Sequence, residues 1–391
     1  MFENSLWLIL GAVGGLLWAN LDYAGYSQML HFKVLANSLL GRAGDGGRVI
    51  DLHFLVNDVL MALFFGLAGR EVWHAVLPGG PMSRPRRAIV PLACAVGGMI
   101  GPACIYVLGA WAIGRLDELG RGWAVPCATD IAFSYMVART LFGPRHPVIP
   151  FLLLLAIVDD ALGMLIVAVF YPQGPVQLVW LLLSASAVIV GVGFRLLRVH
   201  SFWWYLLVPG PLSWLGFALA GLHPALGLLP VVPTIPHAHI HRRHTGWDVL
   251  RLADSRNEME YWLARPVEVV LGVFGLMNAG VLIRQGDAVT LLVLTGLLVG
   301  KPVGIFLSGL ASVRLAGLEL AKGVGLRELL VAGCTAGIGF TVSLFMATVA
   351  FEPGLTQDSA KLGALVSFVA AIIAWALAKA LRVGREKTIA N

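Results

Sequence analysis

Long apolar runs separated by short polar stretches dominate the pattern of hydrophobic and polar positions along this chain. A helix needs about 20 predominantly apolar residues to cross the hydrocarbon core of a bilayer. Most of the runs have that length, so we interpret them as membrane-spanning helices. They begin near Leu6, Phe54, Ala88, Trp123, Pro147, Val176, Phe202, Pro224, Trp262, Thr290, Leu326 and Leu362. The pattern therefore predicts an all-α polytopic membrane protein with twelve transmembrane helices.

The composition favours a single membrane domain. Of the 391 residues, 58% are hydrophobic and only 13% are charged, whereas about 25% of residues are charged in a typical soluble domain. Little of the chain is left for a separate soluble part, so residues 1–391 are expected to form one membrane transport domain. The four cysteines fall inside apolar runs without the paired spacing of a disulfide or zinc framework, so they are expected to be small buried residues. No cofactor is implied.

The basic residues indicate how the helices are oriented. Lys and Arg concentrate in alternate polar stretches, for example around Arg86, around Arg242 and in the C-terminal tail. Cytoplasmic loops carry such an excess of basic residues, so the N- and C-termini are both predicted to be cytoplasmic. The same distribution accounts for the formal net charge of +6, and nucleic-acid binding is therefore excluded as a function.

Two polar insertions stand out between the apolar runs. The first contains the turn-forming segment Gly41–Arg48 between two short strand-like runs, so an outer β-hairpin at about residues 41–52 and a plain flexible loop both fit the sequence. The second is a cytoplasmic loop at about residues 236–258. It contains His237, His239, His241 and His244. Arg242 and Arg243 beside these histidines disfavour a bound metal ion, so a solvated basic loop is predicted.

Small and polar residues interrupt two otherwise apolar helices, the fourth and the eleventh. When the chain is aligned with itself, Cys127–Phe133 matches Cys334–Phe340 at the Cys, Ile and Phe positions. Interrupted helices in corresponding halves of a transporter mark a substrate site near the bilayer midplane. We therefore predict that both helices are discontinuous and lie at a transport site.

Ionisable side chains inside the apolar runs indicate a functional or structural role, because placing each of them at mid-membrane costs at least about 2.5 kcal/mol. They are Asp58, Glu71, Asp130, Asp159, Asp160 and Lys301. The adjacent pair Asp159–Asp160 lies in the middle of the fifth apolar run, where no structural need calls for two carboxylates. Carboxylate oxygens bind Na⁺ only when they are deprotonated, so protons and sodium ions would compete for this pair. A buried pair that only fixes helix packing is the structural alternative.

The remaining central groups have roles that follow from their positions. Lys301 lies mid-helix and cannot easily reach an interface, so it needs a carboxylate partner, either Asp159 or Asp160. Asp130 lies in the predicted helix break, where it would balance the partial charges of helix ends or bind the ion directly. Thr129 beside it can offer a carbonyl or hydroxyl oxygen to a cation.

Three groups nearer the helix ends have both a functional and a structural interpretation. Asp58 fits a structural role better than a part in ion access. Glu71, next to Arg70, belongs either to a cytoplasmic funnel that attracts cations or to an interfacial ion pair. His223 precedes Pro224 at a short outer turn, where it is either a pH-responsive group or, by the simpler interpretation, a surface histidine.

Seven segments of this chain, in their order and spacing, resemble the NhaA family of bacterial sodium/proton antiporters, which is itself an example of a transporter built from inverted repeats. The segments are Asn57–Phe65 (NDVLMALFF), Gly97–Ile100 (GGMI), Trp123–Phe133 (WAVPCATDIAF), Ala156–Asp160 (AIVDD), Asn278–Val281 (NAGV), Gly300–Gly304 (GKPVG) and Gly337–Ser343 (GIGFTVS). The resemblance extends from about Asn57 to the last helix.

The resemblance implies a fold and a set of residue roles. The fold has inverted repeats, and the discontinuous fourth and eleventh helices cross each other. Asp159 and Asp160 take the places of the family's paired transport aspartates, which bind Na⁺ and carry protons. Asp130 takes the place of the aspartate at the helix crossing, and Lys301 that of the lysine that pairs with the first aspartate.

The resemblance also implies a function. A protein of this family exports Na⁺ or Li⁺ from the cytoplasm across the bacterial inner membrane in exchange for H⁺, by alternating access, and so serves sodium and pH homeostasis. The exchange of two protons for each sodium ion makes transport electrogenic. The protein is not an enzyme, it lies in the lipid bilayer, and it forms a homodimer through an outer β-hairpin.

Some segments depart from the family pattern. Glu71-Val-Trp-His-Ala75 places Ala75 where the family has an acidic residue associated with pH sensing, and the turn around His223 also differs. The segment Glu258–Glu268 aligns only with a shift. The resemblance therefore implies the ion chemistry more directly than the pH regulation.

Two rival functions are compatible with mid-membrane carboxylates. A sodium-coupled organic-solute symporter would need room and polar groups for its substrate, and few such groups are present apart from the carboxylates. An intramembrane aspartyl protease needs aspartates on separate segments that face a scissile bond. Asp159 and Asp160 are adjacent in sequence, which disfavours the protease.

Overall fold

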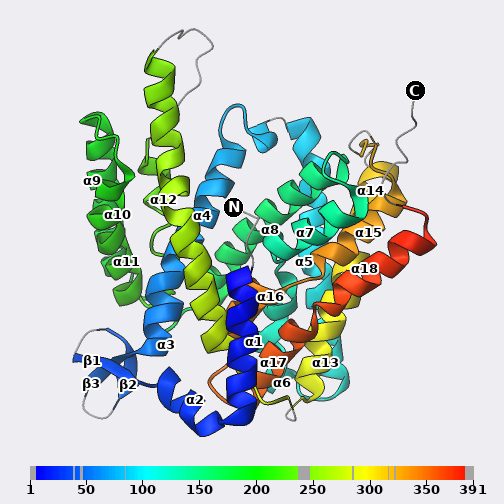
Figure 1. Cartoon of the computed structure of the whole chain (residues 1–391), viewed down its shortest axis with the longest axis horizontal. Coiled ribbons are helices and arrows are strands. Elements are labelled where there is room, and N and C mark those ends of the chain that lie inside the picture. Colours follow the sequence, from blue (N-terminus) through cyan, green and yellow to red (C-terminus); the bar gives the residue numbers. More distant parts are fainter. Residues whose placement is uncertain are drawn as a thin grey trace.

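The computed structural model describes residues 6–37, 40–44, 47–83, 85–236, 247–283, 286–315, 317–320 and 323–383. Within these ranges the chain is mostly helical (Figure 1). Among the described residues, seven helical segments are long and apolar enough to cross a membrane, and a bent pair of helices adds an eighth candidate. The protein is therefore a multi-pass membrane protein, and the count of twelve spans stays a prediction. The seven are Leu52–Ser83, Ala88–Ala112, Val148–Phe170, Leu178–Leu196, Phe202–Ala220, Ala288–Arg314 and Leu355–Ala380.

One group of helices is built around α12. Its members are α1 (Leu6–Leu21), α4 (Met61–Val76), α9 (Leu181–Leu196), α10 (Phe202–Leu207), α11 (Pro209–Ala220) and α12 (Trp247–Asn278). Helices α1, α4 and α10 pack against α12, while α11 joins it through α10 and α9 packs on α11. Helix α1 runs along α12, and α9 runs along α11 (Figure 1). The contact between α1 and α12 is close because it is made by glycines: a Cβ atom on Gly11 would lie 1.9 Å from the carbonyl oxygen of Gly272.

A second group of helices is built around α5 and α14. Its members are α5 (Pro85–Ala112), α7 (Ile131–Phe142), α8 (Val148–Phe170), α13 (Ala288–Thr295), α14 (Lys301–Arg314), α15 (Leu326–Ala336), α16 (Phe340–Ala350), α17 (Leu355–Val366) and α18 (Val369–Ala380). Glycines again allow the close approach of α5 and α14, because a Cβ atom on Gly304 would lie 2.0 Å from the carbonyl oxygen of Gly97. This packing fixes the start of α14, where Lys301 lies, against α5.

Two helical segments are broken in this second group. The 3-10 helix η3 (Gly120–Cys127) ends before α7 begins at Ile131, and residues 128–130 between them are not helical. Helices α15 and α16 are separated at residues 337–339 and bent by 53°. Both breaks fall where the sequence predicts discontinuous helices. The glycine at 337 leaves room for a close approach of the η8 backbone (Gly296–Gly300), since a Cβ atom on Gly337 would lie 2.6 Å from the Leu297 carbonyl oxygen.

The first polar insertion contains a three-stranded antiparallel sheet in the order β1-β3-β2. Its strands are β1 (Lys33–Asn37), β2 (Arg42–Gly44) and β3 (Gly47–Asp51), preceded by α2 (Tyr23–Leu30) and followed by α3 (Leu52–Phe54) and the π-helical turn η1 (Leu55–Leu60). Of the two forms that fit the sequence at about residues 41–52, the hairpin is the one observed, because β2 pairs with β3 in this segment. The sheet lies at the opposite end of the molecule from the first turns of α12 (Figure 1).

Two expectations from the sequence concern other parts of the chain. The four histidines of the predicted cytoplasmic loop, His237, His239, His241 and His244, lie outside the described residues. The expectation that every cysteine is buried is wrong for Cys104, which is exposed on α5. Cys104 continues the exposed stripe of Leu92, Val96, Ile100 and Leu108, which recurs every four residues on one face of α5.

Short helical turns connect these elements. They are α6 (Leu116–Leu119), the 3-10 turns η2 (Pro81–Ser83), η4 (Leu178–Trp180), η5 (Pro224–Leu226) and η6 (Val232–Thr234), and the π-helical turn η8 (Gly296–Gly300).

Candidate functional site

A buried ion pair joins α8 to α14. Lys301 Nζ lies 2.6 Å from Asp159 Oδ2, and neither side chain is exposed. The same ammonium group also donates to the backbone carbonyl of Cys127, at the end of η3. The hydroxyl of Thr129 donates to Asp159 Oδ2 over 2.6 Å and lies 3.2 Å from the Ala336 carbonyl oxygen. Asp159, Lys301 and Thr129 therefore link α8, α14 and both chain breaks.

The helix that carries Lys301 is locally widened. The π-helical turn η8 directly precedes Lys301, and Pro302 follows it. Pro302 has no N–H to donate to the carbonyl four residues earlier, at Leu298, so the regular α-helical ladder is interrupted at this point. Such π-helical turns inside helices often occur at functional sites. The local sequence thus turns a mid-helix lysine toward Asp159.

Asp130 holds the two chain breaks together. Its backbone N–H donates to the Ile338 carbonyl oxygen over 2.7 Å. Its carboxylate accepts the backbone N–H of Phe133, 3.2 Å away, and that of Thr341, 3.1 Å away, as well as the Thr341 hydroxyl proton. One carboxylate therefore binds the first turns of both α7 and α16, where helix dipoles favour a negative charge.

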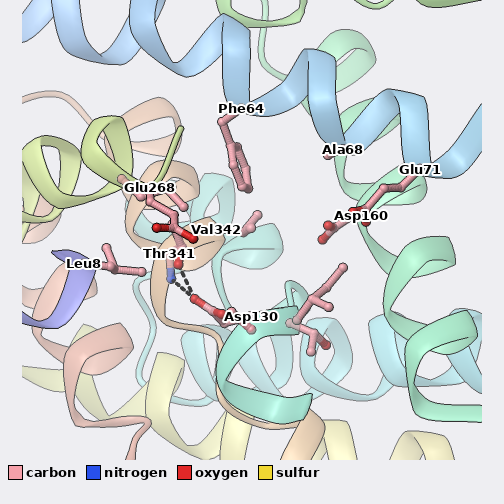
Figure 2. Close-up of a pocket in the computed structure, with 13 residues that line it drawn as sticks. Leu8, Phe64, Ala68, Glu71, Asp130, Asp160, Glu268, Thr341 and Val342 are labelled. Carbon is pink, nitrogen blue, oxygen red and sulfur yellow. Dashed lines mark hydrogen bonds between the residues drawn. The ribbon is translucent and has the colours of Figure 1, made fainter. Parts of the chain in front are cut away.

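Asp160 follows Asp159 directly but faces a different space. Successive helix residues point about 100° apart, and Asp160 lines a cavity of about 80 Å³ in front of the two breaks. Glu71 lies beside Asp160 at this cavity, with Asp130 and Glu268 among the other lining residues (Figure 2). Within the described ranges Asp160 has no hydrogen bond or ion pair, so its oxygens are available to a ligand. Apolar side chains complete the wall: Leu8, Phe64, Leu271 and Val342.

Asp58 and His223 lie at a second and larger cavity, of about 630 Å³. Gln173 Nε2 donates to Asp58 Oδ1 over 3.3 Å, and Trp214 Nε1 donates to the Asp58 carbonyl oxygen over 2.8 Å. His223 Nδ1 lies 3.7 Å from Asp58 Oδ1. The structure does not bring these two residues into the Asp160 cavity, whereas Glu71 lines that cavity.

The interpretation of His223 as a surface histidine is wrong, because its side chain is 4% exposed. The turn at Pro224 folds it inward, against the ring of Phe345. Its Nδ1 accepts the backbone N–H of Ala225, which requires an unprotonated nitrogen. Burial lowers the pKa of His223 from its ordinary value of 6.5 to about 3. The histidine is therefore neutral in this conformation.

Sequence reasoning missed two residues of the Asp160 cavity. Thr341 lies inside the segment Gly337–Ser343 that carries the family resemblance, but its bond to Asp130 depends on how the two breaks pack together. Glu268 lies within an apolar run of α12, between Val267 and Val269. The rule that singled out the other mid-membrane charges would have found Glu268 as well.

Comparisons with known proteins agree with one another. The profile of the family described as Na⁺/H⁺ antiporter 1 matches residues 2–378. A protein named Na(+)/H(+) antiporter NhaA from Jannaschia sp. (strain CCS1) is 47% identical over 410 residues, which cover 98% of this chain and 97% of the relative. The protein of the same name from Desulfitobacterium hafniense (strain DSM 10664 / DCB-2) is 43% identical over 389 residues, with 98% and 96% covered. Its counterpart from Geobacter sulfurreducens (strain ATCC 51573 / DSM 12127 / PCA) is 43% identical over 385 residues, with 98% and 97% covered.

Proposed function

This chain belongs to the Na⁺/H⁺ antiporter 1 family and is a sodium/proton antiporter rather than an enzyme, and we propose that it exchanges the two ions at Asp160, assisted by Asp159 and Thr129. The observation that carries this proposal is the position of Asp160. It is a carboxylate without a protein partner among the described residues, at a small cavity where two chain breaks meet. A cavity of about 80 Å³ suits an ion better than an organic solute.

Competition between the two ions explains the exchange. A carboxylate binds a hard cation such as Na⁺ or Li⁺ only in its deprotonated form. A proton and a sodium ion therefore exclude each other at Asp160, and no separate coupling device is needed. Sodium binds while the site is open to one side of the membrane. After the site has been exposed to the opposite side, protons that arrive there displace the sodium ion.

Lys301 and Asp130 balance charge around the site. Lys301 neutralises Asp159, so that a cation at Asp160 does not face two uncompensated carboxylates. Asp130 occupies the first turns of α7 and α16. We assign these breaks to crossing discontinuous fourth and eleventh helices of a twelve-helix fold with inverted repeats. Relative movement of the group around α12 and the group around α5 and α14 provides alternating access.

Other features fit the wider setting of the family. Both termini lie in the cytoplasm and the protein in the bacterial inner membrane, where the proton gradient drives sodium export for sodium and pH homeostasis. Two protons enter for each sodium ion that leaves, so the cycle is electrogenic. The sheet β1–β3 is the surface through which two copies form a homodimer. Glu71 belongs to the access route for cations. His223, beside Asp58, responds to pH only in a conformation that exposes it, because the buried histidine is neutral.

Reconstituted protein tests the proposal most directly. Proteoliposomes that hold an imposed pH gradient should lose it when Na⁺ or Li⁺ is added, and keep it when an equal amount of K⁺ is added. Sodium competes with protons for the site, so half-maximal exchange should need more Na⁺ as the pH is lowered. A pH gradient that is indifferent to all three cations would refute the antiport mechanism for this chain.

A further inference from the structure

We propose that Glu268 is a cation-binding residue of the antiporter, which binds the incoming cation before Asp160 receives it. The inference rests on the proposed function, because it takes Asp160 as the exchange site. It adds an acidic residue from α12, in the helix group that does not carry the aspartate pair. The predicted site does not include this residue, which ends the segment that aligns with the family pattern only with a shift.

The first observation is the place of Glu268 in the cavity. Glu268 is half-buried and lines the cavity together with Asp160. Figure 2 shows its carboxylate on the side of Thr341 and Val342, across the open space from Asp160 and Glu71. A cation that moves between the α12 side and Asp160 therefore passes along this carboxylate.

The second observation is that nothing in the described part of the chain neutralises Glu268. The nearest basic residue in sequence on the same helix, Arg265, lies three residues earlier and is exposed. Residues three apart on a helix can form an ion pair, yet these two do not. Glu268 also lies in the interior of α12, far from either end, so it does not cap the helix. A structural role through a salt bridge or a cap is therefore not supported.

The third observation is the apolar character of the surrounding wall. A cation that leaves water for a cavity lined by Leu8, Phe64 and Leu271 loses hydration, which is unfavourable. A carboxylate at the same cavity offsets part of this cost through its charge, which acts over a longer range there than in water. Glu268 supplies that charge on the side away from Asp160.

The geometry favours two successive positions for the cation over one shared position. Among the described residues, no three His, Cys, Asp or Glu side chains converge closely enough to hold a metal ion. Glu268 thus does not complete a ligand set with Asp160 and Glu71 in this conformation. It attracts and partly dehydrates the cation, and Asp160 then binds it for exchange.

The test compares Glu268→Gln with Glu319→Gln in proteoliposomes. Glu319 is exposed in the loop after α14 and does not line the cavity, so its variant makes the same change of charge elsewhere. We expect Glu268→Gln to raise the KM for Na⁺ and Li⁺ by about 3- to 10-fold with little change in maximal rate, because it removes binding that precedes exchange. Glu268→Asp should restore most of the wild-type KM, and Glu319→Gln should match the wild type.

Three outcomes would overturn the inference. An unchanged KM in Glu268→Gln, measured on protein that elutes as a folded species, would remove Glu268 from the cation route. Complete loss of exchange at saturating Na⁺ would make it an obligatory part of the cycle instead. An equal rise in KM in Glu319→Gln would assign the effect to overall charge. Asp160→Asn, measured in parallel, separates these results from failure of the proposed function, which would appear as exchange that persists in that variant.

Discussion

Lys301 and Asp159 form an ion pair that is completely enclosed, with Nζ and Oδ2 2.6 Å apart. This pair gives the two adjacent aspartates different environments. Asp159 is bound by Lys301 and Thr129, whereas Asp160 faces a cavity. The sequence doublet Asp-Asp is thus one structurally anchored carboxylate and one available carboxylate.

Removal of the lysine should destabilise the protein. The Lys301→Ala substitution leaves Asp159 buried without its cation, and breaking a buried ion pair from one side costs about 3 to 5 kcal/mol in soluble proteins. We expect the Tm in detergent to fall by several degrees. Lys379→Ala, at an exposed position on α18, should leave the Tm almost unchanged. Equal Tm values for the two variants would argue against a stabilising pair.

Removal of the free carboxylate should stop transport without unfolding the protein. Asp160→Asn keeps the size of the side chain and deletes the charge that both ions share, so Na⁺-driven proton release should disappear. Asp117→Asn, at an exposed position on α6, makes the same chemical change outside the cavity and should transport normally. If Asp160→Asn dissipated a pH gradient at the wild-type rate, the exchange site would lie elsewhere.

The close contact of α5 and α14 should not tolerate even one added methyl group. In Gly304→Ala the new Cβ atom would lie 2.0 Å from the Gly97 carbonyl oxygen, so the helices must separate. Overpacking of this kind costs about 1 to 3 kcal/mol, and it also displaces Lys301. Gly193→Ala on α9 is the control, because its Cβ meets no atom within 4 Å and alanine favours helix. We expect a lower Tm for the first variant and an equal or higher Tm for the second.

Acid should destabilise the conformation in which His223 is buried. Its pKa is about 3 in the folded protein and 6.5 when exposed, so the unfolded chain takes up the proton first as the pH falls. The contribution of the neutral, buried His223 to the free energy of unfolding is therefore complete above pH 6.5. It declines below that pH, by about 1.4 kcal/mol at one unit lower. The Tm of His223→Gln should fall less than the Tm of the wild type when the pH is lowered from neutral to about 5.5.

The exposed His200 provides the control for that comparison. His200→Gln should keep the acid sensitivity of the wild type. An identical acid response in the wild type and His223→Gln would place the sensitivity on another group.

The central site could be predicted from sequence because its chemistry is costly. Asp159, Asp160, Asp130 and Lys301 stand out as charges in apolar helices, and their cost in a membrane marks them without any knowledge of the fold. The helix breaks could also be predicted, since Gly337 and Gly339 weaken a helix locally. These signals are all carried by single residues or by their immediate neighbours.

What sequence could not supply depends on contacts between distant segments. The choice of Asp159 over Asp160 as the partner of Lys301 follows from the packing of α5 against α14, which sets the direction from which the lysine approaches. The burial of His223 depends on Phe345, which is far away in the chain. Thr341 reaches Asp130 only because the two breaks lie against each other. No local pattern in the sequence predicts pairings of this kind.

The last prediction concerns charge movement. On the proposed stoichiometry, two protons enter for each sodium ion that leaves, so one net positive charge moves inward in each cycle. A membrane potential contributes about 2.3 kcal/mol per elementary charge per 100 mV. An inside-negative potential should therefore drive sodium export even when the pH gradient is small.

Right-side-out proteoliposomes loaded with Na⁺ and K⁺ provide the measurement. Valinomycin with little external K⁺ creates an inside-negative potential and should accelerate sodium efflux, whereas valinomycin with equal K⁺ on both sides collapses the potential and should slow it. The Asp160→Asn variant controls for leak, because it should show no efflux that depends on voltage. Efflux rates and a reversal point that both ignore the potential would mean an electroneutral cycle with one proton per sodium ion. Asp159, held by Lys301, would then have only its structural role.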